Sequence, residues 1–120
     1  LFVDDESVLV NMGKQIFESL GYDVATRTSS IEALELFKNQ PDRFDLVITD
    51  MTMPNMTGED LAQELMRIKP NIPIILCTGF SAKIDAQKAS AQGIRALVLK
   101  PIVKREIAIT VRKVLDGRII

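Results

Sequence analysis

Five polar residues that could do chemistry each stand at the end of a short apolar run. Asp4 and Asp5 follow the first run of the chain, Asp50 and Thr78 end two later runs, and Lys100 follows the last. Taken singly these residues are ordinary, since an aspartate after a strand often caps a helix and a lysine usually reaches into water. Their shared position predicts that they gather at one edge of a sheet, and this favours a functional site.

Carboxylates that share one pocket repel each other, so a proton or a cation must compensate them. Lys100 supplies one positive charge only. A divalent ion that prefers hard oxygen ligands completes such a site, and a carboxylate cluster with open water positions suits Mg²⁺ better than zinc. The same ion neutralises an incoming phosphoryl group, and a carboxylate can attack phosphorus to form an aspartyl phosphate. The cluster therefore indicates Mg²⁺-dependent phosphoryl transfer.

The elements that must position these residues follow from the hydrophobic pattern. Strand-like runs alternate with segments of helical period, which is typical of an α/β fold with a parallel sheet. The pattern predicts a flavodoxin-like, doubly wound sheet of five strands in the order 2-1-3-4-5, with five helices, in which ligands bind outside the carboxyl ends of the strands. The expected strands cover residues 1–3, 22–27, 46–50, 72–78 and 96–99, and the expected helices cover residues 8–20, 30–40, 61–68, 82–92 and 107–115.

Composition excludes several other classes of protein. The chain has 120 residues, 47% of them hydrophobic, and a net charge of −1, which fits one globular domain over residues 1–120 rather than a disordered or nucleic-acid-binding chain. We expect the first strand to continue upstream of Leu1. No apolar run approaches the ~20 residues of a membrane helix. With a single cysteine, Cys77, and no histidine, we expect a soluble, cytoplasmic domain without disulfides, histidine-based catalysis or membrane contact.

The order and spacing of these residues resemble the receiver domain of two-component response regulators over essentially the whole chain. The matching motifs are Phe2-Val3-Asp4-Asp5-Glu6, Asp50-Met51-Thr52-Met53-Pro54 with Gly58 following, Thr78-Gly79 and Lys100-Pro101. The resemblance implies that Asp50 is the phosphoacceptor and that Thr78 and Lys100 contact the phosphoryl oxygens. It also implies that Asp4, Asp5, Asp50 and the backbone carbonyl of Thr52 hold Mg²⁺, and that the Lys100–Pro101 peptide bond is cis.

The same resemblance implies partners and a way of signalling. The phosphoryl donor would be a histidine kinase or a histidine phosphotransfer domain, because this chain has no histidine of its own. The signal would pass through the face formed by the helix over 82–92, the strand over 96–99 and the final helix. The domain would promote its own phosphorylation without being a turnover enzyme. A homodimer is an open alternative, as are a stand-alone regulator and the receiver of a hybrid sensor kinase.

Three positions depart from the usual pattern of the family. Leu97 stands where the family often has the aromatic residue that couples to the switch threonine, so the sequence departs from the family at the aromatic part of that switch. Thr52 and Phe80 occupy two positions that tune the lifetime of the acyl phosphate, and neither is acidic or carries an amide. If Phe80 shields the acyl phosphate from water, the phosphorylated form is long-lived, whereas Phe80 could equally be a loop aromatic.

Three other functions fit these residues less well than a phosphoacceptor switch does. A receiver fold that serves only as a dimerisation module would not need the complete set of polar residues. A phosphatase of the haloacid dehalogenase type would have a second acid two residues after its nucleophile, where this chain has Thr52. A nucleotide or flavin binder would have a glycine-rich loop after the first strand, which the sequence lacks.

Overall fold

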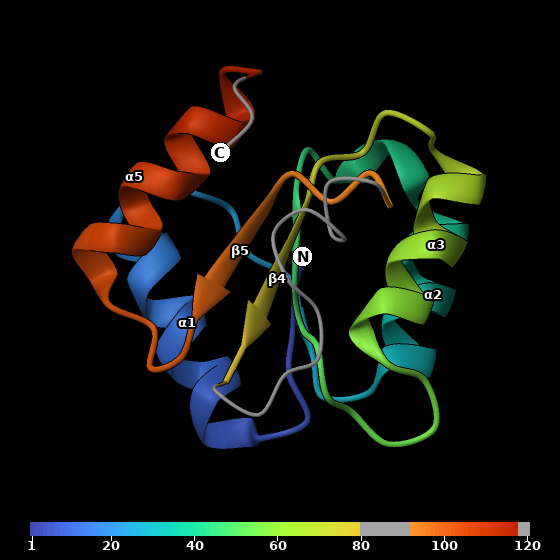
Figure 1. Cartoon of the computed structure of the whole chain (residues 1–120), viewed down its shortest axis with the longest axis horizontal. Helices are drawn as coiled ribbons and strands as arrows, with labels where there is room; N and C mark the ends of the chain where they lie inside the picture. Colours follow the sequence, from blue (N-terminus) through green and yellow to red (C-terminus); the bar gives the residue numbers. More distant parts are fainter. Residues whose placement is uncertain (80–91, 118–120) are drawn as a thin grey trace.

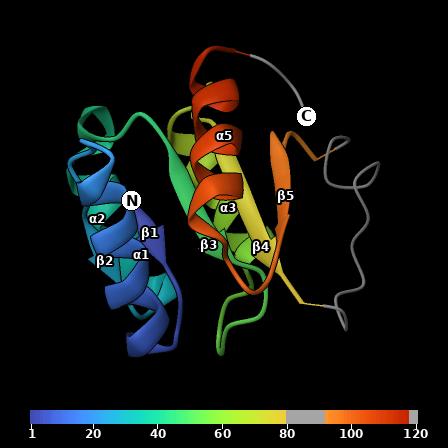
Figure 2. The same cartoon turned by 90° about the vertical axis from the view of Figure 1, so that its left-hand side faces the viewer.

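A computed structural model describes residues 1–79 and 92–117 of the chain. In these residues five strands form one parallel sheet in the order β2-β1-β3-β4-β5, and their labels run in this order from left to right in Figure 2. The predicted strand order is confirmed. The strands are β1 Phe2–Val3, β2 Thr26–Arg27, β3 Val47–Asp50, β4 Ile74–Thr78 and β5 Ala96–Leu99.

Helices cover both faces of this sheet. The described α-helices are α1 Ser7–Ser19, α2 Ser30–Asn39, α3 Gly58–Ile68 and α5 Lys104–Leu115. Helices α1 and α5 lie on one face, and α2 and α3 lie on the other (Figure 1). The helix expected over 82–92 falls outside the described residues, which hold four α-helices where the sequence predicted five in the whole chain. None of the described helices has the length and apolar character that a bilayer crossing requires.

The core divides into two clusters because successive side chains of a strand point to opposite faces of the sheet. Val47, Ile74 and Leu76 pack on the side of α2 and α3, whereas Ile48 and Ile75 pack on the side of α1 and α5. Strands β3 and β4 are buried along their whole length. This double burial explains why their sequences read as continuous apolar runs, which were easy to recognise as strands.

Capping side chains and prolines set the ends of several elements. Ser29 caps α2 by accepting a hydrogen bond from the backbone N–H of Glu32 at 3.4 Å, and Thr57 caps α3 in the same way through Asp60 at 3.2 Å. The predicted start of α3 was residue 61. Because Thr57 caps the helix, α3 instead starts at Gly58. A short 3₁₀ helix, Pro41–Arg43, was not predicted.

Two strands are shorter than predicted by at least two residues, whereas β1 and β3 each lack only the first predicted residue. Strand β2 covers Thr26–Arg27 rather than residues 22–27, because it lies at the sheet edge and its one neighbour, β1, pairs with it only at Phe2 and Val3. Strand β4 begins at Ile74 rather than at residue 72, just after Pro73, which has no N–H to donate to a ladder. Neither difference moves the carboxyl ends of the strands, where the candidate site lies.

Candidate functional site

The predicted polar residues meet at the carboxyl edge of the sheet. Asp4 follows β1, Asp50 ends β3, Thr78 ends β4 and Lys100 follows β5. The parallel ladder aligns neighbouring strand ends, with Asp50 opposite Cys77 and Thr78 opposite Leu99. Residues from four separate parts of the sequence thus reach one edge because their strands run in the same direction.

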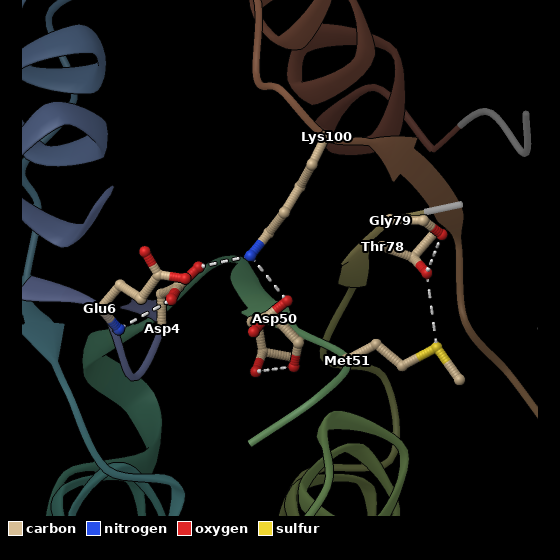
Figure 3. Close-up of polar contacts among 8 residues, drawn as sticks. Asp4, Glu6, Asp50, Met51, Thr78, Gly79 and Lys100 are labelled. Atoms are coloured by element: carbon tan, nitrogen blue, oxygen red, sulfur yellow. Dashed lines mark hydrogen bonds and ion pairs between the residues drawn. The ribbon is translucent and has the colours of Figure 1, made fainter. Parts of the chain in front are cut away.

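One lysine contacts two buried carboxylates at the centre of this edge. The Lys100 Nζ lies 3.0 Å from Asp4 Oδ2 and 2.9 Å from Asp50 Oδ1, and Figure 3 shows its side chain extended between them. Both aspartates are buried, with exposed fractions of 1% and 7%. The other oxygen of Asp4, Oδ1, accepts a hydrogen bond from the backbone N–H of Glu6 at 2.9 Å, which fixes the carboxylate at the start of α1.

A third carboxylate completes an acidic cluster. Asp4, Asp5 and Asp50 each offer one oxygen, and these oxygens all lie within 4.8 Å of one another. Asp5 is exposed, whereas the other two are buried. Three carboxylates against one ammonium leave a formal charge of −2 at this edge, so the cluster can hold a divalent cation.

Burial and charge act together on the ionisation of these groups. Burial raises the pKa of Asp50, the contact with Lys100 opposes this rise, and the charges of Asp4 and Asp5 add to it. For Lys100, burial alone would lower the pKa, but the contacts with Asp50 and Asp4 outweigh it, so its pKa is raised. Lys100 is therefore a permanent cation at neutral pH, whereas Asp50, with its raised pKa, takes up a proton more readily than an exposed aspartate does.

The backbone around Asp50 is fixed by neighbours on two sides. The N–H of Met51 donates to Cys77 O on β4 at 2.9 Å, and Met51 O accepts from the N–H of Gly58 at 2.8 Å. A Cβ at Gly58 would lie 2.2 Å from the Asp50 carbonyl oxygen, so only glycine permits this approach of α3 to the site. The hydroxyl of Thr49 donates to that same carbonyl at 3.0 Å. Asn55 takes a positive φ of 72° in the loop between them.

Thr78 is at the same edge but does not contact the ion pair. Its buried hydroxyl lies 3.7 Å from Met51 Sδ and 3.3 Å from Gly79 O, and Figure 3 shows it directed toward these two residues rather than toward Asp50 and Lys100. This contact was not predicted from the sequence. A thioether is a weak acceptor on a flexible side chain, and no sequence pattern signals such a pair.

The remaining predicted residues lie around this centre. The Lys100–Pro101 peptide bond is cis. Thr52 has an exposed side chain in the loop after Asp50, and Leu97 is half-buried against the cluster that α2 and α3 cover. Phe80 lies outside the described residues, and with it the expected shielding of an acyl phosphate.

A separate hollow lies at the opposite end of the strands. Its volume is about 730 Å³, and Phe17, Tyr22, Phe44 and Leu46 are among its lining residues. None of the acidic cluster, Thr78 or Lys100 lines it. The chemistry therefore belongs to the shallow carboxyl edge of the sheet rather than to this cavity.

Comparison with known proteins identifies the family. Residues 1–112 match the model of the family described as the response regulator receiver domain. The chain belongs to this family. Receiver domains are the phosphoacceptor switches of two-component signalling, and they generally bind Mg²⁺ at an acidic cluster. Membership sets aside the alternative of a phosphatase of the haloacid dehalogenase type.

Curated relatives and solved structures agree with this assignment. The receiver domain is 35% identical over 115 residues to the response regulator SaeR of Staphylococcus aureus and 31% identical over 116 residues to the sensor kinase CckA of Brucella abortus. The matches span 96% and 97% of this chain, but only 49% of the response regulator and 12% of the sensor kinase. A receiver domain protein from Clostridium thermocellum superposes with a TM-score of 0.91 at 31% identity, with 97% and 92% of the two chains covered.

Proposed function

We propose that this receiver domain accepts a phosphoryl group on Asp50 from a phosphohistidine donor in an Mg²⁺-dependent reaction. The observation that carries the proposal is the convergence of Asp4, Asp5 and Asp50 with Lys100 at one edge of the sheet. We propose Asp50 as the acceptor because it ends the central strand β3, belongs to the acidic cluster and contacts Lys100 at 2.9 Å.

The residues present fit Mg²⁺. Opposite oxygens around an octahedral Mg²⁺ lie about 4.2 Å apart, so oxygens that are already within 4.8 Å of one another need only small side-chain rotations. Asp4, Asp5 and Asp50 would hold the ion, and we propose the backbone carbonyl of Thr52 as a further ligand. When bound, the ion supplies positive charge beside the phosphoryl oxygens and lowers the repulsion between phosphate and carboxylates.

Asp50 then acts as a nucleophile. One of its carboxylate oxygens attacks the phosphorus, a new O–P bond forms, and the P–N bond of the phosphohistidine breaks with its electron pair returning to the imidazole nitrogen. Lys100 already contacts Asp50 at 2.9 Å, so its ammonium can follow the charge that moves onto the phosphoryl oxygens. Thr78 can donate its hydroxyl to the same oxygens after it leaves its present acceptors.

The partner and the output surface are part of the proposal. The donor would be a histidine kinase or a histidine phosphotransfer domain in the cytoplasm. The similarity to a sensor kinase is compatible with this domain being the receiver of a hybrid kinase. We propose that phosphorylation is read out around β5 and α5, where Leu99 and Val103 expose 60% and 47% of their surface close to Lys100. A homodimer through this face is one form of that readout.

The test is the intact mass of the protein after incubation with acetyl phosphate, with and without Mg²⁺. We expect one phosphoryl adduct that requires Mg²⁺ and is absent in Asp50→Asn. Asp45→Asn is the matched control, because Asp45 is an exposed aspartate just before the same strand segment, at its other end. The proposal is contradicted if the folded protein gains no adduct while a positive-control receiver domain is phosphorylated under the same conditions. A dimerisation module that is not phosphorylated would then be the better hypothesis.

A further inference from the structure

The hydroxyl of Thr78 is held by two acceptors, and neither belongs to the Asp50–Lys100 pair. Met51 Sδ lies 3.7 Å from Thr78 Oγ1, and the carbonyl oxygen of Gly79 lies 3.3 Å from it. Figure 3 shows the Met51 side chain extending from beside Asp50 toward Thr78, while the Lys100 ammonium lies between Asp4 and Asp50. The hydroxyl has one proton, so it can serve only one strong acceptor at a time.

Met51 is well placed to accept the Thr78 hydroxyl because hydrogen bonds hold its backbone on both sides. Its N–H is tied to Cys77 on β4 and its carbonyl to Gly58 at the start of α3. The side chain is half-buried beside the buried Thr78, where a hydroxyl without any acceptor would lose free energy. The sulfur and the carbonyl oxygen of Gly79 therefore both stabilise the hydroxyl in a position where it contacts neither Asp50 nor Lys100.

We infer that Met51 is a positioning residue that keeps the Thr78 hydroxyl in a resting place outside the phosphoryl site. This inference rests on the proposed function, because it assigns a role to Met51 in the same reaction. To contact a phosphoryl group on Asp50, the hydroxyl must exchange the thioether for a phosphoryl oxygen. A stronger contact between the hydroxyl and the sulfur would slow that exchange. Removal of the sulfur should therefore favour the contact between the hydroxyl and the phosphoryl group.

The substitution Met51→Leu tests this directly, since leucine has nearly the volume of methionine but no acceptor. We expect the initial rate of adduct formation with acetyl phosphate, at a donor concentration below saturation, to rise two- to fivefold. That ratio corresponds to about 0.4–1 kcal/mol. Met56→Leu is the matched control, because Met56 is another half-buried methionine of the same loop, and its rate should equal that of the parent protein.

A second background separates positioning from packing. In Thr78→Val the hydroxyl is absent and the shape is kept, so adding Met51→Leu to this variant should leave its rate unchanged. In unphosphorylated protein with ¹³C-methyl methionine, Thr78→Val should shift the resonance of the Met51 methyl and leave that of Met56 in place. Two results together support the inference. Thr78→Val shifts the Met51 methyl resonance, and Met51→Leu no longer changes the rate when Thr78→Val is already present.

The outcomes that overturn it are distinct from failure of the proposed function. A Met51→Leu rate equal to that of the parent, or an equal increase in the Thr78→Val background, would show that the sulfur does not act through the hydroxyl. Either result removes the role of Met51 and leaves Asp50 as the acceptor. Absence of any adduct on the parent protein would instead remove the proposed function, and this inference with it.

Discussion

Lys100 is the residue on which the electrostatics of the site depend. Its ammonium contacts both buried carboxylates, so it stands where a metal ion would otherwise supply positive charge. A buried carboxylate without a partner is strongly destabilising, and the pair of contacts makes the cluster tolerable in the absence of Mg²⁺. In the unphosphorylated domain, Lys100 and a metal ion therefore both compensate the negative charge of the buried carboxylates.

This competition predicts that Lys100→Met binds Mg²⁺ more tightly than the parent protein. An ammonium a few ångströms from a divalent cation repels it, and we expect the dissociation constant to fall roughly five- to twentyfold once that repulsion is removed. Isothermal titration calorimetry at low salt measures it. Lys104→Met, at an exposed lysine at the start of α5, is the control and should not change the affinity. Weaker binding in Lys100→Met would contradict the competition.

The raised pKa of Asp50 predicts a pH-dependent effect on stability. The folded protein protonates this carboxyl more readily than the unfolded chain does, so the free energy of unfolding falls as pH rises from 3.8 through the raised pKa. In EDTA at pH 7, Asp50→Asn should therefore melt at a higher temperature than the parent protein. This advantage should shrink as the pH falls through the raised pKa, where the parent carboxyl takes up its proton.

Thermal denaturation followed by circular dichroism across this pH range checks the prediction. Glu35→Gln removes an exposed carboxylate on α2, away from the acidic cluster, and should melt with the parent at every pH. A difference between Asp50→Asn and the parent that stays constant with pH would mean that the buried charge is not its source.

At the scale of elements, the start of α3 is packed against the end of β3. The Cβ of an alanine at residue 58 would lie 2.2 Å from the carbonyl oxygen of Asp50 and 2.9 Å from Met51 Cα, both backbone atoms that cannot turn aside. Gly58→Ala should therefore lower the free energy of unfolding by about 2–3 kcal/mol. Urea denaturation measures the loss.

Gly79 offers the matched control for this change. It lies at the same edge of the sheet, but a Cβ there would meet nothing within 4 Å. We expect Gly79→Ala to change the free energy of unfolding by less than about 0.5 kcal/mol. Equal losses in the two variants would show that the close approach of α3 is not what selects glycine at residue 58.

The elements that could be predicted from sequence are those whose environment is uniform. Strands β3 and β5 were recognised because apolar runs end in a polar residue, and β3 is buried on both faces. The edge strand β2 was overestimated because its length depends on the few residues that β1 offers, which no local pattern reveals. The 3₁₀ helix at Pro41 was missed because a proline after a helix signals only that the helix has ended.

At the scale of the whole molecule, the sheet order brought the expected residues together. Asp4, Asp50, Thr78 and Lys100 share one edge, as the parallel strands predicted. What sequence could not give was which of them touch. The double contact of Lys100 and the turning of Thr78 toward Met51 depend on side-chain rotamers and on distances of a few ångströms.

Assembly of the acidic cluster links the stability of the fold to Mg²⁺. An ion that binds only the folded state adds about 1.4 kcal/mol at ten times its dissociation constant. For a domain of this size the melting temperature should rise by about 4–6 °C. Differential scanning calorimetry over a series of Mg²⁺ concentrations tests this, and Asp4→Asn should lose most of the rise. A rise of the same size in Asp4→Asn would place the ion elsewhere.

The contact between Lys100 and Asp4 joins two residues that are 96 positions apart in the chain. During synthesis the amino-terminal acids leave the ribosome long before this lysine does. Until Lys100 has emerged, Asp4 and Asp50 lack the ammonium that pairs them, and β5 cannot close the edge of the sheet beside β4. A nascent chain therefore cannot complete the candidate site until nearly all of the domain has been translated.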